Sequence, residues 1–249
     1  MSALWFEADW PAPPGVRTLS TLRGAAGEGG VSRLPYEHFN LGDHVGDDVA
    51  AVAENRRHLK VEARLPAEPF WLAQVHGVAV ADLDRTARLG TADAAVARGL
   101  GKVCAILTAD CLPIVLATQS GDKVAAAHAG WRGLAAGVIE ATVHALEAHG
   151  RDLLAWLGPA IGPRHFEVGA EVREAFLKAD PAAAAAFEPN ARGRFMADLP
   201  QLARRRLENL GVTRIYGGGE CTFAQAERYY SHRREGITGR QATLIWREG

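Results

Sequence analysis

The chain has 249 residues, 48% of them hydrophobic and 23% charged, which excludes a mostly disordered chain, a coiled coil or a collagen-like repeat. Its 28 Lys and Arg residues are balanced by 29 Asp and Glu residues, and a net charge of −1 disfavours a nucleic-acid groove. The N-terminus lacks the basic start of a signal peptide, and the longest apolar run, 103–117, is too short for a bilayer. We therefore expect a cytoplasmic protein with reduced thiols and no membrane partner.

The predicted elements follow a turn-rich first third of the sequence. In chain order the patterns predict a helix over 48–60, strands over 70–76, 103–108, 112–117 and 123–128, a helix over 134–149, a strand over 153–157, helices over 169–178 and 199–210, and strands over 212–216 and 242–246. No linker or repeat divides the chain, and regular βαβ alternation is missing from this order. We expect an α+β fold, a single layered domain over 1–249 with mixed β-sheets flanked by helices, and no Rossmann fold.

Three segments share one pattern, in which an apolar strand ends in a metal-ligand residue type beside small residues. They are Gln74-Val75-His76-Gly77, Thr108-Ala109-Asp110-Cys111 and Ala127-His128-Ala129-Gly130. Side chains at such strand ends can converge on one pocket, and two imidazoles with a thiolate suit Zn²⁺. Three protein ligands leave one coordination position open, as in a catalytic zinc site. The pattern predicts zinc at His76, Cys111 and His128, with Asp110 as a partner of the ligands or a proton acceptor.

The same residues also fit two other interpretations. Buried cysteines and hydrogen-bonded histidines at strand ends are common in ordinary protein cores. Alternatively, Cys111 is a nucleophile with His128 as its base and Asp110 or Gln74 as the orienting group, the arrangement of a cysteine hydrolase. Sequence spacing does not separate this dyad from a zinc site. The remaining cysteines have no histidine close to them in sequence and are assigned to the core or to a pocket wall: Cys104 and Cys221.

Glycine-rich turns and arginines predict a site for an anion. Backbone amides around Gly29-Gly30-Val31-Ser32 suit a phosphate nest. Arg132 is the favoured arginine for a ligand, because Gly130-Trp131-Arg132-Gly133 follows His128 almost directly. The chain has no GxGxxG after a strand, no GxxxxGK[ST] and no HxE…PCxxC. A nucleotide cofactor and the usual zinc deaminase layout are therefore unsupported.

Taken in order, the motifs resemble those of a known family. They include Asn40-Leu41-Gly42, Gln74-Val75-His76, Thr108-Ala109-Asp110-Cys111-Leu112-Pro113, His128-Ala129-Gly130-Trp131-Arg132-Gly133 and Tyr230-Ser231-His232-Arg233-Arg234. This series resembles the YfiH/YlmD family, whose members were once described as laccase-like or as polyphenol oxidases. The resemblance covers about residues 18–246 and implies a fold similar to that of a cysteine-hydrolase group.

The resemblance implies a purine nucleoside enzyme. Family members are described as phosphorylases of adenosine, inosine, guanosine and S-methyl-5′-thioadenosine that also deaminate adenosine. The family's metal ligands correspond to His76, Cys111 and His128, and Cys111 and His128 also count, with Asp110, as the expected catalytic residues. The expected substrate-binding residues are Ser32, Asn40, Arg56 and Arg132.

Two departures from the family pattern concern the expected pocket. The stretch between Arg23 and Gly29 is longer than in the family, so the resemblance assigns Ser32, and not Arg23, to the substrate pocket. His232 stands where the family usually has Tyr, and we expect it to alter the rim of the pocket.

The copper-oxidase description fits the sequence poorly. Multicopper oxidases need paired His-x-His motifs and a His₂Cys copper, often with an axial Met, whereas none of the nine histidines here forms such a pair. The only methionines are Met1 and Met196. The hypotheses are therefore a zinc-dependent purine nucleoside phosphorylase, a cysteine amidase or peptidoglycan-precursor editing hydrolase using Cys111 and His128, a disfavoured copper-dependent polyphenol oxidase, and a zinc-binding regulatory module without turnover.

Overall fold

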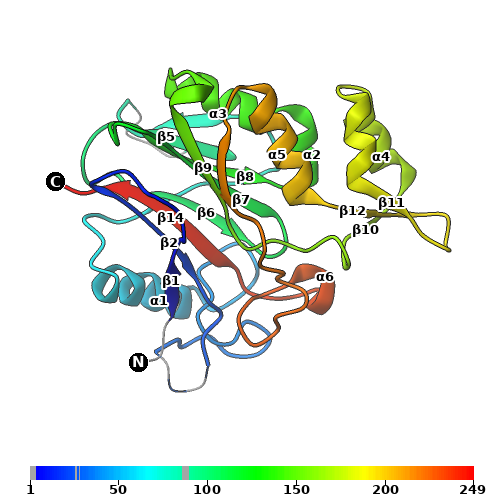
Figure 1. Ribbon diagram of the computed structural model, residues 1–249. Helices are drawn as coiled ribbons and strands as arrows, with labels where there is room; N and C mark the ends of the chain where they lie inside the picture. Colours follow the sequence, from blue (N-terminus) through cyan, green and yellow to red (C-terminus); the bar gives the residue numbers. More distant parts are fainter. Residues whose placement is uncertain (1–3, 26, 28, 86–89) are drawn as a thin grey trace.

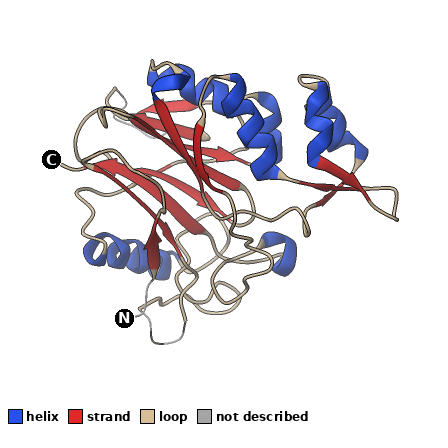
Figure 2. Ribbon diagram, in the orientation of Figure 1, coloured by secondary structure: helices blue, strands red, loops and turns tan. Residues whose placement is uncertain are grey.

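Two β-sheets packed face to face form the centre of the fold, and helices cover their outer faces (Figures 1 and 2). The structure is a computed structural model that describes residues 4–25, 27, 29–85 and 90–249. Three apolar clusters separate the layers: one between the sheets, one between the larger sheet and its helices, and one between the other sheet and α1. This arrangement is a mixed α+β fold, as the sequence predicts.

The first sheet runs in the order β1-β2-β14-β6-β3. Its pairs are antiparallel except β3 with β6, which are parallel. Helix α1 lies below this sheet in Figure 1, and its N-cap Asp48 accepts hydrogen bonds from the first backbone N–H groups. The bounds are β1 Trp5–Glu7, β2 Val16–Thr21, α1 Val49–Glu62, β3 Phe70–Trp71, β6 Cys104–Thr108 and β14 Gln241–Arg247.

The second sheet runs in the order β13-β9-β7-β8-β5-β4 and carries α2, α3 and α5 on its outer face. Successive side chains of β7 point to opposite faces of the sheet, and both faces are apolar. Ile114 and Leu116 face the helices and Val115 faces the other sheet, so β7 is buried in the middle of the fold. The bounds are β4 Val80–Asp82, β5 Ala94–Ala97, β7 Leu112–Thr118, β8 Val124–Ala129, α2 Trp131–Ala136, α3 Val138–Leu146, β9 Leu153–Leu157, α5 Leu199–Asn209 and β13 Arg214–Gly217.

A smaller sheet, in the order β10-β12-β11, extends from the edge of the molecule together with α4 (Figure 1). The short helix α6 lies near the first sheet and follows a long irregular segment. None of the helices in the described part of the chain has the length and hydropathy needed to cross a membrane. The bounds are 3₁₀ helix Gly150–Asp152, β10 Glu167–Val168, α4 Ala170–Leu177, 3₁₀ helix Pro181–Ala186, β11 Phe187–Pro189, β12 Phe195–Ala197 and α6 His232–Glu235.

Two predicted elements differ from the observed ones. The helix predicted over 134–149 begins earlier, at Trp131, and is divided into α2 and α3 at Gly137, whose φ of 104° is left-handed and interrupts a helix. The strand predicted over 70–76 is wrong beyond Trp71, because the N–H groups of Val75 and His76 donate to a side chain instead of a neighbouring strand.

The packing of β7 predicts a large loss of stability on truncation of Leu116, which is fully buried. Leu116→Ala should lower the free energy of unfolding by about 2–5 kcal/mol, because it leaves a cavity between sheet and helices. Leu100, which is 56% exposed, is the matched control. Leu100→Ala should change the free energy by less than about 0.5 kcal/mol in urea unfolding. Equal losses for both variants would contradict the assigned core.

Candidate functional site

Three side chains predicted as metal ligands come together at the edge of the two sheets. One ligand atom from each of His76, Cys111 and His128 lies within 4.8 Å of the others. The Cys111 Sγ is 3.6 Å from the His76 Nε2, and the two imidazole rings lie 4.7 Å apart. Two imidazole nitrogens and one thiol are a donor set that suits a transition metal. The geometry of these residues therefore fits a metal ion.

A buried carboxylate, Asp93, holds the turn that carries His76. Its oxygens accept hydrogen bonds from the backbone N–H groups of Val75 at 3.2 Å, His76 at 2.8 Å and Gly77 at 2.7 Å. These bonds replace strand pairing and hold His76 at a φ of 62°, in the left-handed region. The imidazole of His76 is thereby presented beside Cys111.

Asp93 also orients the second histidine. Its Oδ1 lies 2.9 Å from the His128 Nδ1, so the other ring nitrogen, Nε2, is the one left for the site. Burial by itself would raise the pKa of Asp93, but the hydrogen bonds from His128 and the turn outweigh burial and lower the pKa. Asp93 is therefore a carboxylate that contacts two of the three candidate ligands, one through its backbone and one through its ring.

Cys111 precedes β7 and has the surroundings of a reactive thiol. Burial would raise the pKa of this thiol, but the charge of His128 and hydrogen bonds from His128 and His76 lower it to about 6. The pKa of His128 moves in the opposite direction, because Cys111 and Asp93 outweigh the effect of its burial. The pair therefore favours a thiolate beside an imidazolium in the metal-free protein.

Gly130 and Gly133, which follow His128 in the chain, lie too close to neighbouring atoms to carry a side chain. A Cβ at Gly130 would lie 2.7 Å from the His76 Cδ2 and 2.9 Å from the Cys111 Sγ. A Cβ at Gly133 would lie 2.9 Å from the backbone oxygen of Gly77. Both positions therefore need glycine for the start of α2 to pack against the ligands and the turn.

The three ligands line a cavity of about 420 Å³. Among the described residues, no Asp or Glu lines this cavity, so its polar surface suits an anion. Arg132 lines it, with its guanidinium 4.4 Å from the centre of the ring of its neighbour, Trp131. His232 also lines it, which places the departure from the family's Tyr at the pocket. The basic side chains in the lining are His44, His76, His128, His232, Arg132 and Arg240.

Asp110 lies beside Cys111 in sequence but does not line the cavity. Its φ is 90°, and its two carboxylate oxygens accept hydrogen bonds from the Thr222 hydroxyl at 2.6 Å and the Arg233 N–H at 2.7 Å. Asp110 therefore joins the end of β6 to α6, through Arg233, and to the irregular segment before α6, through Thr222. This position suits a residue that holds Cys111 in place.

The other predicted substrate-binding residues do not line this cavity, and Arg56 lines a different pocket, beside α1. Ser32 donates its hydroxyl to Asp47, and Asn40 donates its amide to the same carboxylate. Arg56 donates to the backbone oxygen of Leu41 and lies 3.3 Å from the carboxylate of Asp43. All three contact residues 40–47, a loop that contributes His44 to the cavity.

Two site residues were not assigned to the site from the sequence. Asp93 lies in an alanine-rich strand region without a motif, and Arg240 ends the Thr238-Gly239-Arg240 motif of the family resemblance, to which no site role was given. The structure also contains a second thiol–imidazole contact, which the sequence did not predict. The Cys221 Sγ lies 3.4 Å from the His165 Nδ1. Neither member of this pair lines the cavity.

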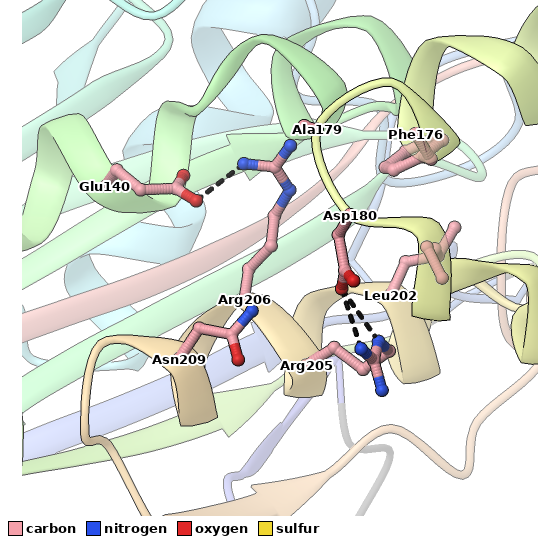
Figure 3. A pocket seen from close by; sticks show the side chains of 9 residues that line it. Glu140, Phe176, Ala179, Asp180, Leu202, Arg205, Arg206 and Asn209 are labelled. Carbon is pink, nitrogen blue, oxygen red and sulfur yellow. Dashed lines mark hydrogen bonds and ion pairs between the residues drawn. The ribbon is translucent and has the colours of Figure 1, made fainter.

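Another pocket, between α3, α5 and the segment after α4, differs in its electrostatics (Figure 3). Arg205 pairs with Asp180 at 2.8 Å and Arg206 pairs with Glu140 at 2.5 Å, as the dashed lines show. The charges of these arginines are neutralised within the chain. This pocket, of about 110 Å³, is therefore a poor site for an anion.

Comparison with known proteins shows the family of this chain. Residues 24–248 match the family described as multi-copper polyphenol oxidoreductase laccase. The chain belongs to this family. Relatives in the family include purine nucleoside phosphorylase PA4543 of Pseudomonas aeruginosa, which is 55% identical over 243 residues, covering 97% of this chain and 98% of the relative. Purine nucleoside phosphorylase YfiH of Escherichia coli is 50% identical over 238 residues, covering 95% of this chain and 96% of the relative.

Solved structures in the comparison share the fold. Protein NMB0706 of Neisseria meningitidis has a TM-score of 0.93 and 44% identity, covering 99% of this chain and 100% of that one. YlmD of Geobacillus stearothermophilus has a TM-score of 0.90 and 28% identity, covering 100% of this chain and 98% of that one. These likenesses confirm the family resemblance and the α+β class, while the likeness to cysteine hydrolases stays a prediction.

Asp93→Asn should weaken metal binding while leaving the fold intact. The amide cannot accept hydrogen bonds at both of its ends, so the His76 turn and the His128 ring lose their common anchor. We expect the affinity for added Zn²⁺ to fall about 10–100-fold in competition with a chromophoric chelator. Asp122→Asn, at an exposed carboxylate bonded to Thr118 and Ser120, is the control and should bind zinc as the parent does. Unchanged affinity in Asp93→Asn would contradict the anchoring role.

The thiol of Cys111 should alkylate at unusually low pH in chelator-treated protein. Since its pKa is lowered to about 6, the thiolate persists as pH falls until about that value. Iodoacetamide labelling, quantified on the Cys111 peptide by mass spectrometry, should be half-maximal near pH 6. An ordinary cysteine thiol would give a midpoint at about pH 8.5. His128→Ala should move the midpoint upward. A midpoint near the ordinary thiol value in both proteins would contradict the described coupling.

Proposed function

We propose that this protein is a zinc-dependent purine nucleoside phosphorylase that also deaminates adenosine. The observation that carries the proposal is the three-ligand group at a cavity lined by basic side chains and, in the described residues, by no carboxylate. The names of the relatives support the same reaction. Its substrates would be inorganic phosphate and adenosine, inosine, guanosine or S-methyl-5′-thioadenosine.

His76, Cys111 and His128 would hold the zinc ion. The donor set and the depressed pKa of Cys111 support this assignment, because a metal binds the thiolate and the neutral imidazole. When bound, Zn²⁺ supplies a Lewis acid that polarises an oxygen of phosphate or water. Asp93 fixes the ring orientation of His128 and the backbone of His76.

Phosphorolysis exchanges one bond at the sugar for another. The C1′–N9 bond of the nucleoside breaks, a phosphate oxygen bonds to C1′, and the purine leaves with the bonding electrons and takes up a proton. Positive charge develops at the sugar, so a fixed phosphate below the ring stabilises the transition state. Arg132 would bind that phosphate from the cavity wall, while Asp110 holds Cys111 in position.

Ser32, Asn40 and Arg56 would act through the loop that they hold. Each contacts residues 40–47, and a rigid loop fixes the side of the cavity to which His44 belongs. Deamination would use the same cavity with water in place of phosphate, replacing the amino group at purine C6 by oxygen and releasing ammonia. The cysteine hydrolase remains the competing function, because the Cys111 and His128 pair has the electrostatics of a thiolate dyad.

Product analysis by chromatography tests the proposed reaction. Protein of measured zinc content should release adenine from adenosine only with phosphate, and chelation should abolish this release until zinc is restored. Inosine formed without phosphate would report deamination. A fully metallated protein that turns over no nucleoside would refute the proposal, and inactivation by alkylation without any metal requirement would favour the cysteine hydrolase.

Cys111→Ala should abolish both activities, because it removes one of three ligands while leaving the core untouched. We expect circular dichroism and the unfolding midpoint to stay close to the parent values. Cys221→Ala is the matched control, since this thiol does not line the cavity, and it should retain full turnover. Retained nucleoside turnover in Cys111→Ala would contradict the metal-site assignment.

A further inference from the structure

Arg240 is held at the cavity by contacts from a distant part of the chain. Its backbone N–H donates to the Asn40 Oδ1 at 2.8 Å, and its backbone oxygen accepts from Leu41 at 3.1 Å. The side chain passes over Gly42, where a Cβ would lie only 2.7 Å from the Arg240 Cγ. The loop and this turn therefore fix the direction of the side chain, which lines the same cavity as the metal-ligand group.

The guanidinium of Arg240 has unused hydrogen-bonding capacity. Its Nη1 donates to the backbone oxygens of Thr238 and Gly239, both at 2.9 Å. The described residues offer no hydrogen-bond partner to Nη2 or Nε, and no carboxylate within ion-pair distance. Three other half-buried arginines pair with carboxylates, Arg23 with Glu235, Arg56 with Asp43 and Arg206 with Glu140, whereas Arg204 and Arg247 use two of their nitrogens each on backbone oxygens. A half-buried guanidinium with free, accessible donors suits an anionic ligand.

His44 brings an imidazole to the same cavity from the loop 40–47; its side chain is 57% exposed, and its Nδ1 lies 3.6 Å from the Asp43 Oδ1. Burial together with the charge of Arg240 lowers the pKa of His44, against the opposing effect of Asp43. Burial likewise lowers the pKa of Arg240, although the charges of Cys111 and Asp110 act in the other direction. An anion bound at this cavity would offset the charge of Arg240 and so favour a proton on His44.

We infer that Arg240 and His44, together with Arg132, bind a phosphate oxyanion inside this cavity. A planar guanidinium with free donors matches two oxygens of a tetrahedral phosphate, and an imidazole supplies a further hydrogen bond. The inference rests on the proposed function in one respect, namely that the anion is the inorganic phosphate used in phosphorolysis. The same chemistry would also fit the phosphate of a nucleotide, and the experiment distinguishes the two.

Two measurements on Arg240→Gln test the site. The first is the thermal shift produced by inorganic phosphate, without nucleoside, against chloride at equal ionic strength. The second is the pair of KM values for phosphate and adenosine. We expect the variant to lose the phosphate-induced shift and to raise the KM for phosphate at least about tenfold, with the KM for adenosine changed less than about twofold. Arg205→Gln, which removes an equal charge from the pocket in Figure 3, should behave as the parent.

Further variants keep the test decisive if Arg240→Gln folds poorly. Arg240→Lys keeps the charge and the stem over Gly42 but not the paired donors, so it should raise the KM for phosphate by an intermediate factor. His44→Gln should raise it by a smaller factor. An unchanged phosphate shift and KM in Arg240→Lys and Arg240→Gln would overturn the inference.

The outcomes separate this site from the proposed function. Loss of the phosphate shift in Arg240→Gln, in a protein whose parent turns over no nucleoside, would support the site and refute the phosphorylase. Phosphate-dependent turnover that is unaffected in Arg240→Gln would support the phosphorylase and refute the site. Stabilisation by AMP but not by inorganic phosphate would overturn the assignment to free phosphate.

Discussion

The hydrogen bonds accepted by Asp93 impose the main constraint on the site. This side chain is fully buried, and a carboxylate in the interior is costly unless its oxygens are bonded. Three successive N–H groups, from Val75 to Gly77, and the His128 ring satisfy it. To donate together, the three N–H groups must leave the sheet, which is why β3 ends at Trp71 and His76 has a left-handed φ. The ligand geometry thus follows from the need to satisfy one buried charge.

The sequence identified the candidate ligands but not the residue that arranges them. His76, Cys111 and His128 stand out because imidazole and thiol side chains at strand ends carry a specific chemistry. Asp93 is one carboxylate beside an alanine-rich strand, and its role depends on the pairing of β5 with β8, which aligns Ala94 with Ala127. That register joins residues more than thirty positions apart and leaves no local pattern.

The fold was predictable where the signal is local. Helices α1 and α5 follow from apolar spacing and from caps at Asp48 and Asp198. The strands β1 and β2 were missed because β2 is paired with β14 at the other end of the chain, with Thr18 opposite Ile245. The contact between Asn40 and Arg240 spans 200 residues in the same way. Such contacts depend on tertiary packing, so propensity and motif spacing do not reveal them.

The family's description names copper, but the arrangement of the candidate ligands in this chain differs from that of a multicopper oxidase. A type 1 copper site also uses two histidines and a cysteine, so the ligand types alone do not separate it from zinc. That copper usually has a weak axial Met, whereas Met196 lies in β12, where its sulfur contacts Asn190. A multicopper oxidase further needs a trinuclear cluster, and the described residues contain one group of three or more candidate ligands, not two. The ligand set therefore fits a single metal site at the cavity that the basic side chains line, and not the two kinds of copper site of a multicopper oxidase.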